Sequence, residues 1–169
     1  MIDIEAILQR LLIHGHETEV LEFKEAKNDY SFHKIGRYFS ALANEANLLD
    51  KKEAWLVFGV RDEDKTIVGS RYRANPAELH SLKKEICDKT TNRITFKEIF
   101  QVQTDKGRVI LFQIPAAPPG MPVAWEGTWY GRDGESLVKL NIEEIERIRS
   151  QGREEDWSRA ICEEATIAD

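Results

Sequence analysis

The sequence contains little of what marks a secreted, membrane-spanning or nucleotide-hydrolysing protein. Its 169 residues include only two cysteines, Cys87 and Cys162, which lie far apart and without CxxC spacing. Such a pair makes no disulfide framework and favours a reducing compartment. No apolar run approaches the roughly 18 residues of a membrane span, and the N-terminal MIDIEAILQR is amphipathic rather than signal-like. Because P-loop and GxGxxG patterns are also absent, we expect a soluble, cytoplasmic protein that neither contacts a membrane nor cradles phosphates in a glycine loop.

Acidic residues outnumber basic ones, but the two kinds are unevenly distributed along the chain. The net charge is −6, which by itself argues mildly against a nucleic-acid partner. Residues 65–108 nevertheless carry ten Lys and Arg against five Asp and Glu, a net charge of +5, and the remainder carries −11. A basic middle between acidic flanks can present a positive face to phosphates. Ordinary solvated helix and hairpin surface explains the same lysines equally well.

Hydrophobic periodicity predicts alternating helices and strands. Residues 2–14 and 31–48 place apolar side chains at helical spacing, and Ser31 is a suitable N-cap for the second helix. EVLEFK, residues 19–24, alternates as a half-buried strand, with Glu22 and Lys24 on the polar side. AWLVFGV, residues 54–60, is apolar throughout, which is typical of a central strand buried on both faces.

The second half of the chain reads as a helix, a hairpin and a ribbon. A short strand is expected at 66–68, a helix over 76–89 with a proline in its first turn, and a hairpin around Asp105-Lys106-Gly107. A proline-rich loop then leads to a ribbon of short strands and to a helix over 141–149. We therefore expect an α+β fold with a mixed, largely antiparallel sheet covered by helices. Residues 1–150 form the expected domain, and 151–169 an acidic tail or the start of a further C-terminal region.

The carboxylates around the first strand are candidates for metal chemistry. Glu22 and Lys24 share one strand face, Glu17 precedes that strand, and Asp62 follows the central one. Carboxylates brought together from separate elements suit Mg²⁺ or Mn²⁺, and a neighbouring lysine can stabilise the developing charge on a phosphate. A solvated strand face is the alternative, and E-x-K spacing alone favours it.

Three further blocks of sequence add to this pattern. EVLEFKEAK is followed by IGRYFSALAN and then by WLVFGVRDEDKTIVG, and PVAWEGTWYGRDGESLVKLNIEEIERIR closes the region. This order resembles the Schlafen AlbA-type domain family, with its E-F-K strand, S-A-x-A-N helix end, G-V-x-D hairpin closing in I-V-G, and aromatic-x-R-x-G-x-S ribbon. The likeness covers about residues 5–150.

The resemblance implies both a fold and a function. It implies an α+β sheet domain that is usually regarded as DNA-binding and is common in bacterial proteins resembling transcription regulators. Vertebrate relatives use the same domain as a metal-dependent ribonuclease, and their three carboxylates match Glu17, Glu22 and Asp62 by motif. In that role these residues would hold Mg²⁺ or Mn²⁺, with Lys24 assisting.

The sequence thus predicts a nucleic-acid-binding domain of low sequence specificity, serving a bacterial transcriptional regulator and needing no cofactor to bind DNA or RNA. The expected phosphate contacts are Arg71, Arg73, Lys83, Lys84, Arg93, Lys97 and Arg132. The first alternative is a metal-dependent endoribonuclease with the three-carboxylate site. The second is a dimerisation or protein-interaction module, in which a homodimer forms through the sheet and the aromatic ribbon. A C-terminal domain beyond residue 169 is a further expected partner.

Overall fold

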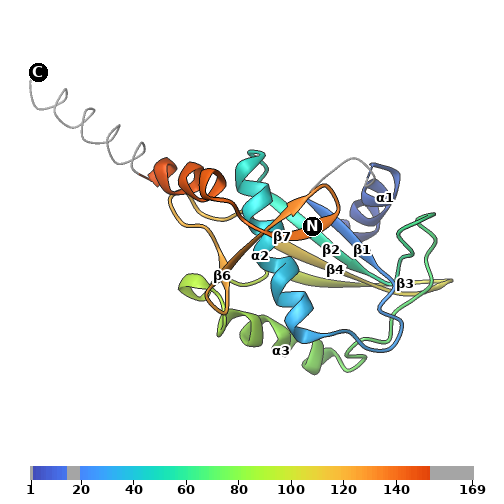
Figure 1. The fold of residues 1–169 in the computed structure, drawn as a ribbon. Helices are drawn as coiled ribbons and strands as arrows, with labels where there is room; N and C mark the ends of the chain where they lie inside the picture. Colours follow the sequence, from blue (N-terminus) through green and yellow to red (C-terminus); the bar gives the residue numbers. More distant parts are fainter. Residues whose placement is uncertain (1, 15–19, 153–169) are drawn as a thin grey trace, which may run out of the picture.

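The structure is a computed structural model, and it describes residues 2–14 and 20–152 (Figure 1). The helices and strands of the first half are α1 (Ile4–His14), β1 (Leu21–Lys24), α2 (Phe32–Leu48) and β2 (Glu53–Phe58). The second half contains α3 (Pro76–Cys87), a single 3-10 turn η2 (Thr91–Arg93), β3 (Glu98–Thr104), β4 (Gly107–Pro115), β5 (Ala124–Trp125), β6 (Thr128–Asp133), β7 (Ser136–Lys139) and a helix that includes residues 142–152.

Two sheets organise these elements, and the expected α+β fold with mixed, largely antiparallel pairing is confirmed. The larger sheet has the order β1-β2-β4-β3, in which only β1 and β2 are parallel. The smaller sheet, which we call the ribbon, pairs β5, β6 and β7 in antiparallel fashion. Because β2 is an interior strand with both faces covered, its uninterrupted apolar sequence is explained.

Helix α2 packs on one face of the larger sheet and also contacts the ribbon, whereas α1 covers the other face of the sheet. On the α2 side, Phe39 and Leu42 belong to the same apolar cluster as Leu56 and Phe58 of β2. On the α1 side, a second cluster contains the alternate strand residues, among them Phe23 and Trp55, together with Leu8 and Leu11 of α1. Helix α1 therefore covers one face of the sheet, and α2 together with the ribbon covers the other.

The contact between α2 and the ribbon uses small and polar residues at a spacing of four. A side chain on Gly36 would overlap the Trp125 ring, because its Cβ would lie only 2.1 Å from a ring carbon. Ser40 Oγ donates to the Val123 carbonyl at 2.7 Å and accepts from the Tyr130 amide at 3.0 Å. Asn44 donates to the carbonyls of both residues at 2.9 and 2.8 Å and accepts from the Val123 amide at 2.7 Å. The S-A-x-A-N segment within α2 thus hydrogen-bonds the main chain of the ribbon and of Val123 just before it.

Local signals placed the helix starts correctly. Ser31 Oγ accepts from the Lys34 amide at 3.4 Å, and Asn75 caps α3 just before its first-turn proline. Asn141 and Glu144 form a reciprocal capping box ahead of residues 142–152. The strand expected at 66–68 is only one bridge, Val60 with Ile67, because Asp64 binds the Thr66 amide and turns the chain there. Most of the expected acidic tail lies outside the described residues.

We predict that Asn44→Ala destabilises the fold by about 2–4 kcal/mol. The substitution removes the hydrogen bonds that Asn44 makes with the Val123 amide and the Tyr130 carbonyl. Urea unfolding followed by circular dichroism measures the loss. The matched control is Asn28→Ala, at an exposed position, where the expected change is within about 0.5 kcal/mol. Equal effects of the two substitutions would contradict a stabilising role for the Asn44 hydrogen bonds.

Candidate functional site

Glu22 lies at the centre of a buried ion-pair network rather than on a solvated strand face. It projects from β1 toward α2, and only 8% of the residue is exposed. Its carboxylate is 3.1 Å from Lys24 Nζ and also accepts a short hydrogen bond from Arg132. The half-buried strand expected from the sequence is therefore covered on both faces, since the ribbon packs over its polar side.

Arg132 connects the ribbon to the sheet edge. Its side chain is 1% exposed, and its guanidinium donates to the carbonyls of Leu21 at 3.0 Å and Glu135 at 3.3 Å as well as to Glu22. Its amide donates to Glu45 Oε1 on α2 at 2.9 Å. Because β1 is an edge strand whose Val20 carbonyl bonds to β2, the Leu21 carbonyl points away from the sheet, and Arg132 caps it. Arg132 is therefore buried in this structure, and its expected phosphate contact stays a prediction.

Lys24 and two tyrosines extend the network toward the start of α2. Lys24 Nζ lies 5.1 Å from the centre of the Tyr38 ring. Burial alone would lower the pKa of Lys24, but the Tyr38 side chain and the Glu22 carboxylate outweigh it and raise that pKa. Burial raises the pKa of Tyr30 to about 12. The Tyr30 hydroxyl is buried without a hydrogen-bond partner among the described residues.

The other expected carboxylates do not join Glu22 in the described part of the chain. Asp62 lies in an exposed turn, where its Oδ1 is 2.9 Å from Lys65 Nζ. That ammonium group is 4.9 Å from the centre of the Phe23 ring, which faces α1, on the opposite side of β1 from Glu22. Within residues 2–14 and 20–152, no three His, Cys, Asp or Glu side chains gather closely enough to hold a metal ion. Glu17 lies outside the described residues, so the three-carboxylate Mg²⁺ or Mn²⁺ site stays a prediction.

The remaining expected phosphate contacts fall into two groups. On and around α3, most are matched by carboxylates. Their pairs are Arg73 with Glu85, Lys83 with Glu98, Lys84 and Arg93 with Asp88, and Lys97 with Glu53. Hydrogen bonds from Arg73 and Lys83 hold the pKa values of Glu85 and Glu98 below their usual range. Arg71, by contrast, is exposed and forms no ion pair with another described residue.

Arg71 borders a polar hollow that the sequence reasoning did not identify. The hollow has a volume of about 630 Å³, and we call it the Gly69–Gly107 pocket. Its lining residues are Lys27, Asn28, Val68, Gly69, Ser70, Arg71, Ala74, Gln103, Gly107 and Arg108. In the sequence, two glycines could have pointed to this pocket. Gly69 ends the I-V-G segment, and Gly107 ends the Asp105-Lys106-Gly107 turn.

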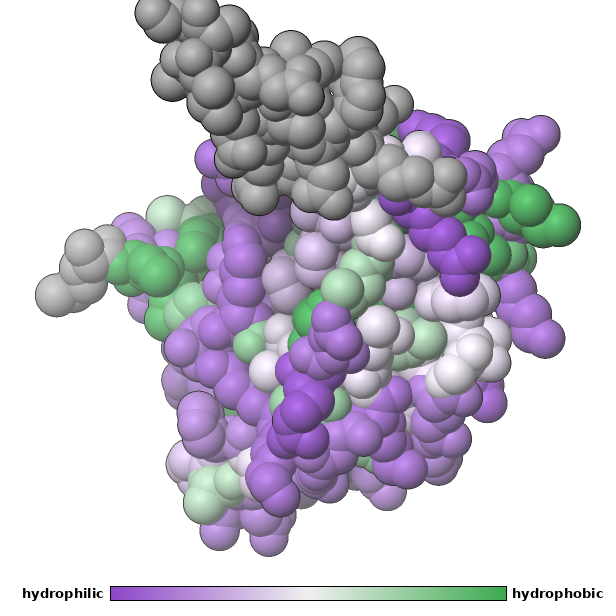
Figure 2. Space-filling view, turned by 90° about the vertical axis from the view of Figure 1, so that its left-hand side faces the viewer, coloured by the Kyte–Doolittle hydropathy of each residue, from purple (hydrophilic) through white to green (hydrophobic). Residues whose placement is uncertain are grey.

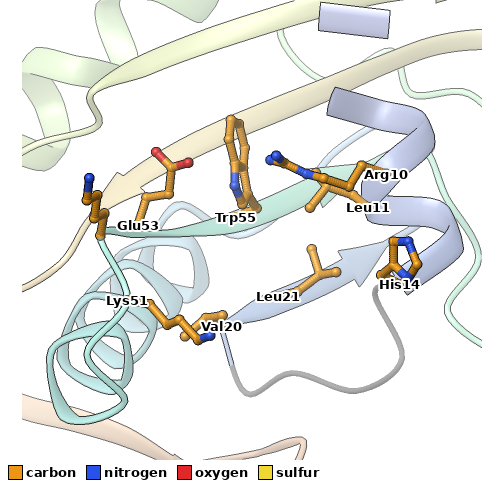
Figure 3. Close-up of a pocket in the computed structure, with 9 residues that line it drawn as sticks. Arg10, Leu11, His14, Val20, Leu21, Lys51, Glu53 and Trp55 are labelled. Carbon is orange, nitrogen blue, oxygen red and sulfur yellow. The ribbon is translucent and has the colours of Figure 1, made fainter. Parts of the chain in front are cut away.

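A second hollow, of about 440 Å³, lies on the α1 side of the larger sheet (Figure 3). Leu11, Leu21 and Trp55 form its apolar part, and Arg10 and Lys51 stand at its border (Figure 3). This hollow is separate from the ion-pair network, because Leu21 and Trp55 belong to the apolar cluster on the opposite face of the sheet from Glu22.

The exposed large apolar residues of the described chain come from several separate segments. Figure 2 shows a face that is mostly hydrophilic, with hydrophobic residues in separate small areas. The large apolar residues exposed in the described chain belong to different elements, namely Ile2, Ile13, Leu49, Val138 and Ile142. No helix in the described ranges is both long and apolar enough to cross a membrane. The homodimer and protein-interaction alternative stays a prediction.

Comparison with known proteins supplies a family and a fold. The sequence profile described as "Schlafen, AlbA_2" matches residues 17–141. The DIP2311 protein of Corynebacterium diphtheriae is similar in structure, with a TM-score of 0.59 at 15% identity over 87% of this chain. The chain spans only 28% of that protein's length. The N-terminal domain of a protein from Nitrosomonas europaea, named as related to the ATP-dependent DNA helicase RecG, has a TM-score of 0.51 at 16% identity over 83% of this chain and 90% of its own. No curated protein matches the chain.

We predict that Arg132→Met destabilises the protein by about 3–5 kcal/mol, because Glu22 is left buried without its main partner. The double variant Glu22→Met/Arg132→Met should recover much of this loss, since both charges leave the interior together. Urea unfolding of the two single variants, the double variant and the wild type forms a double-mutant cycle. Arg37→Met, at an exposed position of α2, is the control. Additive losses at Glu22 and Arg132 would show that the pair does not act as a unit.

We also expect stability to fall between about pH 10 and pH 12, with Tyr30 contributing to the fall. Its folded pKa of about 12 exceeds the unfolded value of about 10, so the unfolded state releases the proton first as the pH rises. Tyr30→Phe should therefore lose less stability than the wild type over that range. Urea unfolding at several pH values, with tyrosinate absorbance as the direct readout, checks this. Identical pH slopes for the two proteins would contradict it.

Proposed function

The chain belongs to the Schlafen AlbA_2 family, and from that premise we propose that it is a nucleic-acid-binding domain that contacts the sugar–phosphate backbone with low sequence specificity. The family match and the neighbour named for a DNA helicase both point to a nucleic-acid-related domain. We further propose that it serves a bacterial transcriptional regulator. The family match supports that role, because the resemblance in sequence implies a domain common in bacterial proteins that resemble transcription regulators.

The proposal rests on the location of the Lys and Arg side chains that have no carboxylate partner in the described chain. Residues 65–108 hold ten Lys and Arg. Seven of them pair with carboxylates, including Lys65 with Asp62 and Lys89 with Glu126. The three without a carboxylate partner in the described chain are Arg71, Lys106 and Arg108. All three lie in or next to the Gly69–Gly107 pocket, so the excess charge is local even though the whole chain is acidic.

The proposal of low sequence specificity is supported by the cations on and next to α3, which are already paired with a carboxylate. The exposed cations of α3 and the turn after it, Lys84 and Arg93, share Asp88 as a partner. A helix that reads bases needs side chains free to bond base edges in a groove. Cations that contact phosphates hold the nucleic acid without reporting its sequence.

The metal-dependent endoribonuclease implied by the vertebrate relatives remains a prediction. Its test is to incubate short labelled RNA with the protein and Mn²⁺ or Mg²⁺, and Glu22→Gln is the variant of choice. Cleavage that needs the metal and disappears in Glu22→Gln, provided that this variant stays folded, would favour that function. In the absence of cleavage, binding alone describes the activity.

We predict that the protein binds short labelled RNA and DNA of unrelated sequences with similar affinities, and that EDTA leaves this binding unchanged. Affinity should fall by at least tenfold between about 50 and 200 mM salt, because phosphate contacts release counterions. Fluorescence anisotropy measures both effects. Binding that does not weaken with salt, or that shows strong preference for one sequence, would contradict the backbone-contact proposal.

A further inference from the structure

The Gly69–Gly107 pocket forms where two distant loops come into direct contact. Gly69 ends the I-V-G segment and Gly107 begins β4, and both have positive φ angles, +81° and +130°. A Cβ on Gly107 would lie 2.7 Å from the Gly69 Cα, which is closer than real Cβ atoms come. Only glycine allows this approach and these backbone angles together. At these two glycines the lining of the pocket is therefore main chain without a side chain.

Arg108 fixes one wall of the pocket. Its guanidinium donates to the carbonyls of Tyr72 at 2.6 Å, Arg73 at 3.0 Å and Ser70 at 3.3 Å, and its Nε donates to Gln101 at 2.8 Å. Partial burial lowers the pKa of Arg108, but arginine remains charged in proteins. No carboxylate neutralises it in the described chain, so a positive charge is held rigidly at this wall.

Two exposed cations, Lys27 and Arg71, also line the pocket. The Arg71 amide donates to the Lys27 carbonyl at 2.7 Å, which keeps these two residues side by side. Lys27 has one distant carboxylate partner, Glu25, with 3.9 Å between Nζ and Oε1, and both side chains are well exposed. An exposed pair at that distance is weak. Lys27 is therefore able to exchange this partner for a ligand.

We propose that the Gly69–Gly107 pocket binds a phosphate group, and that its occupant is a phosphate of a nucleic-acid backbone held by Arg71 and Lys27 against the fixed charge of Arg108. This inference rests on the proposed function and deepens it, because it selects one site from the several basic groups of the chain. The lining contains three cations, the polar side chains of Asn28, Ser70 and Gln103, and no carboxylate. Such a composition attracts anions, and Arg71 offers a planar fork that matches phosphate oxygens.

The cations around α3 make a poorer phosphate site. A phosphate arriving at Arg73, Lys83 or Lys97 would have to displace a carboxylate that already occupies the cation. Lys84 and Arg93 are more exposed, but Asp88 lies between them and repels an anion. The pocket, by contrast, holds its charges next to glycine main chain that a phosphate can approach closely.

The decisive experiment measures RNA and DNA binding by the 169-residue chain and by Arg71→Gln and Lys27→Gln, using fluorescence anisotropy at about 50 mM salt. Loss of one phosphate contact should weaken binding by about tenfold and lower the salt slope by about one. Arg71→Gln and Lys27→Gln should each show such a loss, on RNA and DNA alike, with unchanged circular dichroism and urea midpoint.

Two matched arginine variants locate the effect. Arg37→Gln removes the same charge from an exposed position on α2 and should weaken binding by less than about twofold to threefold, because long-range charge alone is screened at this salt. Arg93→Gln tests the competing surface around α3 and should also have a small effect. The pocket assignment is overturned if Arg71→Gln binds as well as the wild type, or if Arg37→Gln or Arg93→Gln loses as much.

A second measurement separates the site from the function. Amide NMR signals of Gly69 and Gly107 should shift on adding a short oligonucleotide, and far less on adding inorganic phosphate at equal concentration. Equal shifts with both ligands would mean that the pocket binds free phosphate rather than a nucleic-acid backbone. If the wild type binds no oligonucleotide and phosphate alone shifts these signals, the proposed function fails while the phosphate site stands. If oligonucleotides bind without shifting them, the function stands and the pocket is refuted.

Discussion

The contact between Glu22 and Arg132 is the constraint on which the arrangement of layers depends. A carboxylate and a guanidinium are both taken out of water, and their attraction offsets much of the desolvation cost of each. Arg132 reaches Glu22 only if β6 lies against the edge of β1, so the pair fixes where the ribbon crosses the sheet. Gly131 supports the same approach, since a Cβ there would meet Leu140 at 2.6 Å and the Glu45 carboxylate at 3.2 Å.

Helix α2 transmits this constraint to the rest of the fold. Its apolar side packs on β2 and β4, and its opposite side carries Ser40, Asn44 and Glu45, which bond the ribbon main chain. Residues that look like a functional signature in the sequence therefore have a structural task. The Gly69–Gly107 pocket lies apart from this contact, in loops where the I-V-G segment meets the β3–β4 turn.

Local patterns predicted the elements well, because each depends on neighbouring residues. The caps at Ser31 and Asn141 and the uniform apolar run of β2 are examples. Alternation also predicted correctly that Glu22 and Lys24 share a face. It could not predict that this face is buried, because the residue that covers Glu22 is 110 positions away and belongs to another sheet.

Pairing between charges was equally invisible in the sequence. Counting cations identified the basic segment, but most of its members turned out to be matched by acids such as Glu53 and Glu126, which come from other segments. The placement of Asp62 depends on the turn made by residues 61–66 rather than on the strand before it. Glu17 lies outside the described residues, so the three-carboxylate hypothesis stays a prediction.

The buried pair also has a consequence for how the sequence can drift. A replacement at either Glu22 or Arg132 alone removes a close charge partner from the ion that remains buried, whereas a joint exchange for two apolar side chains avoids that penalty. Across homologues, these two positions should therefore covary, although they stand at opposite ends of the domain's sequence.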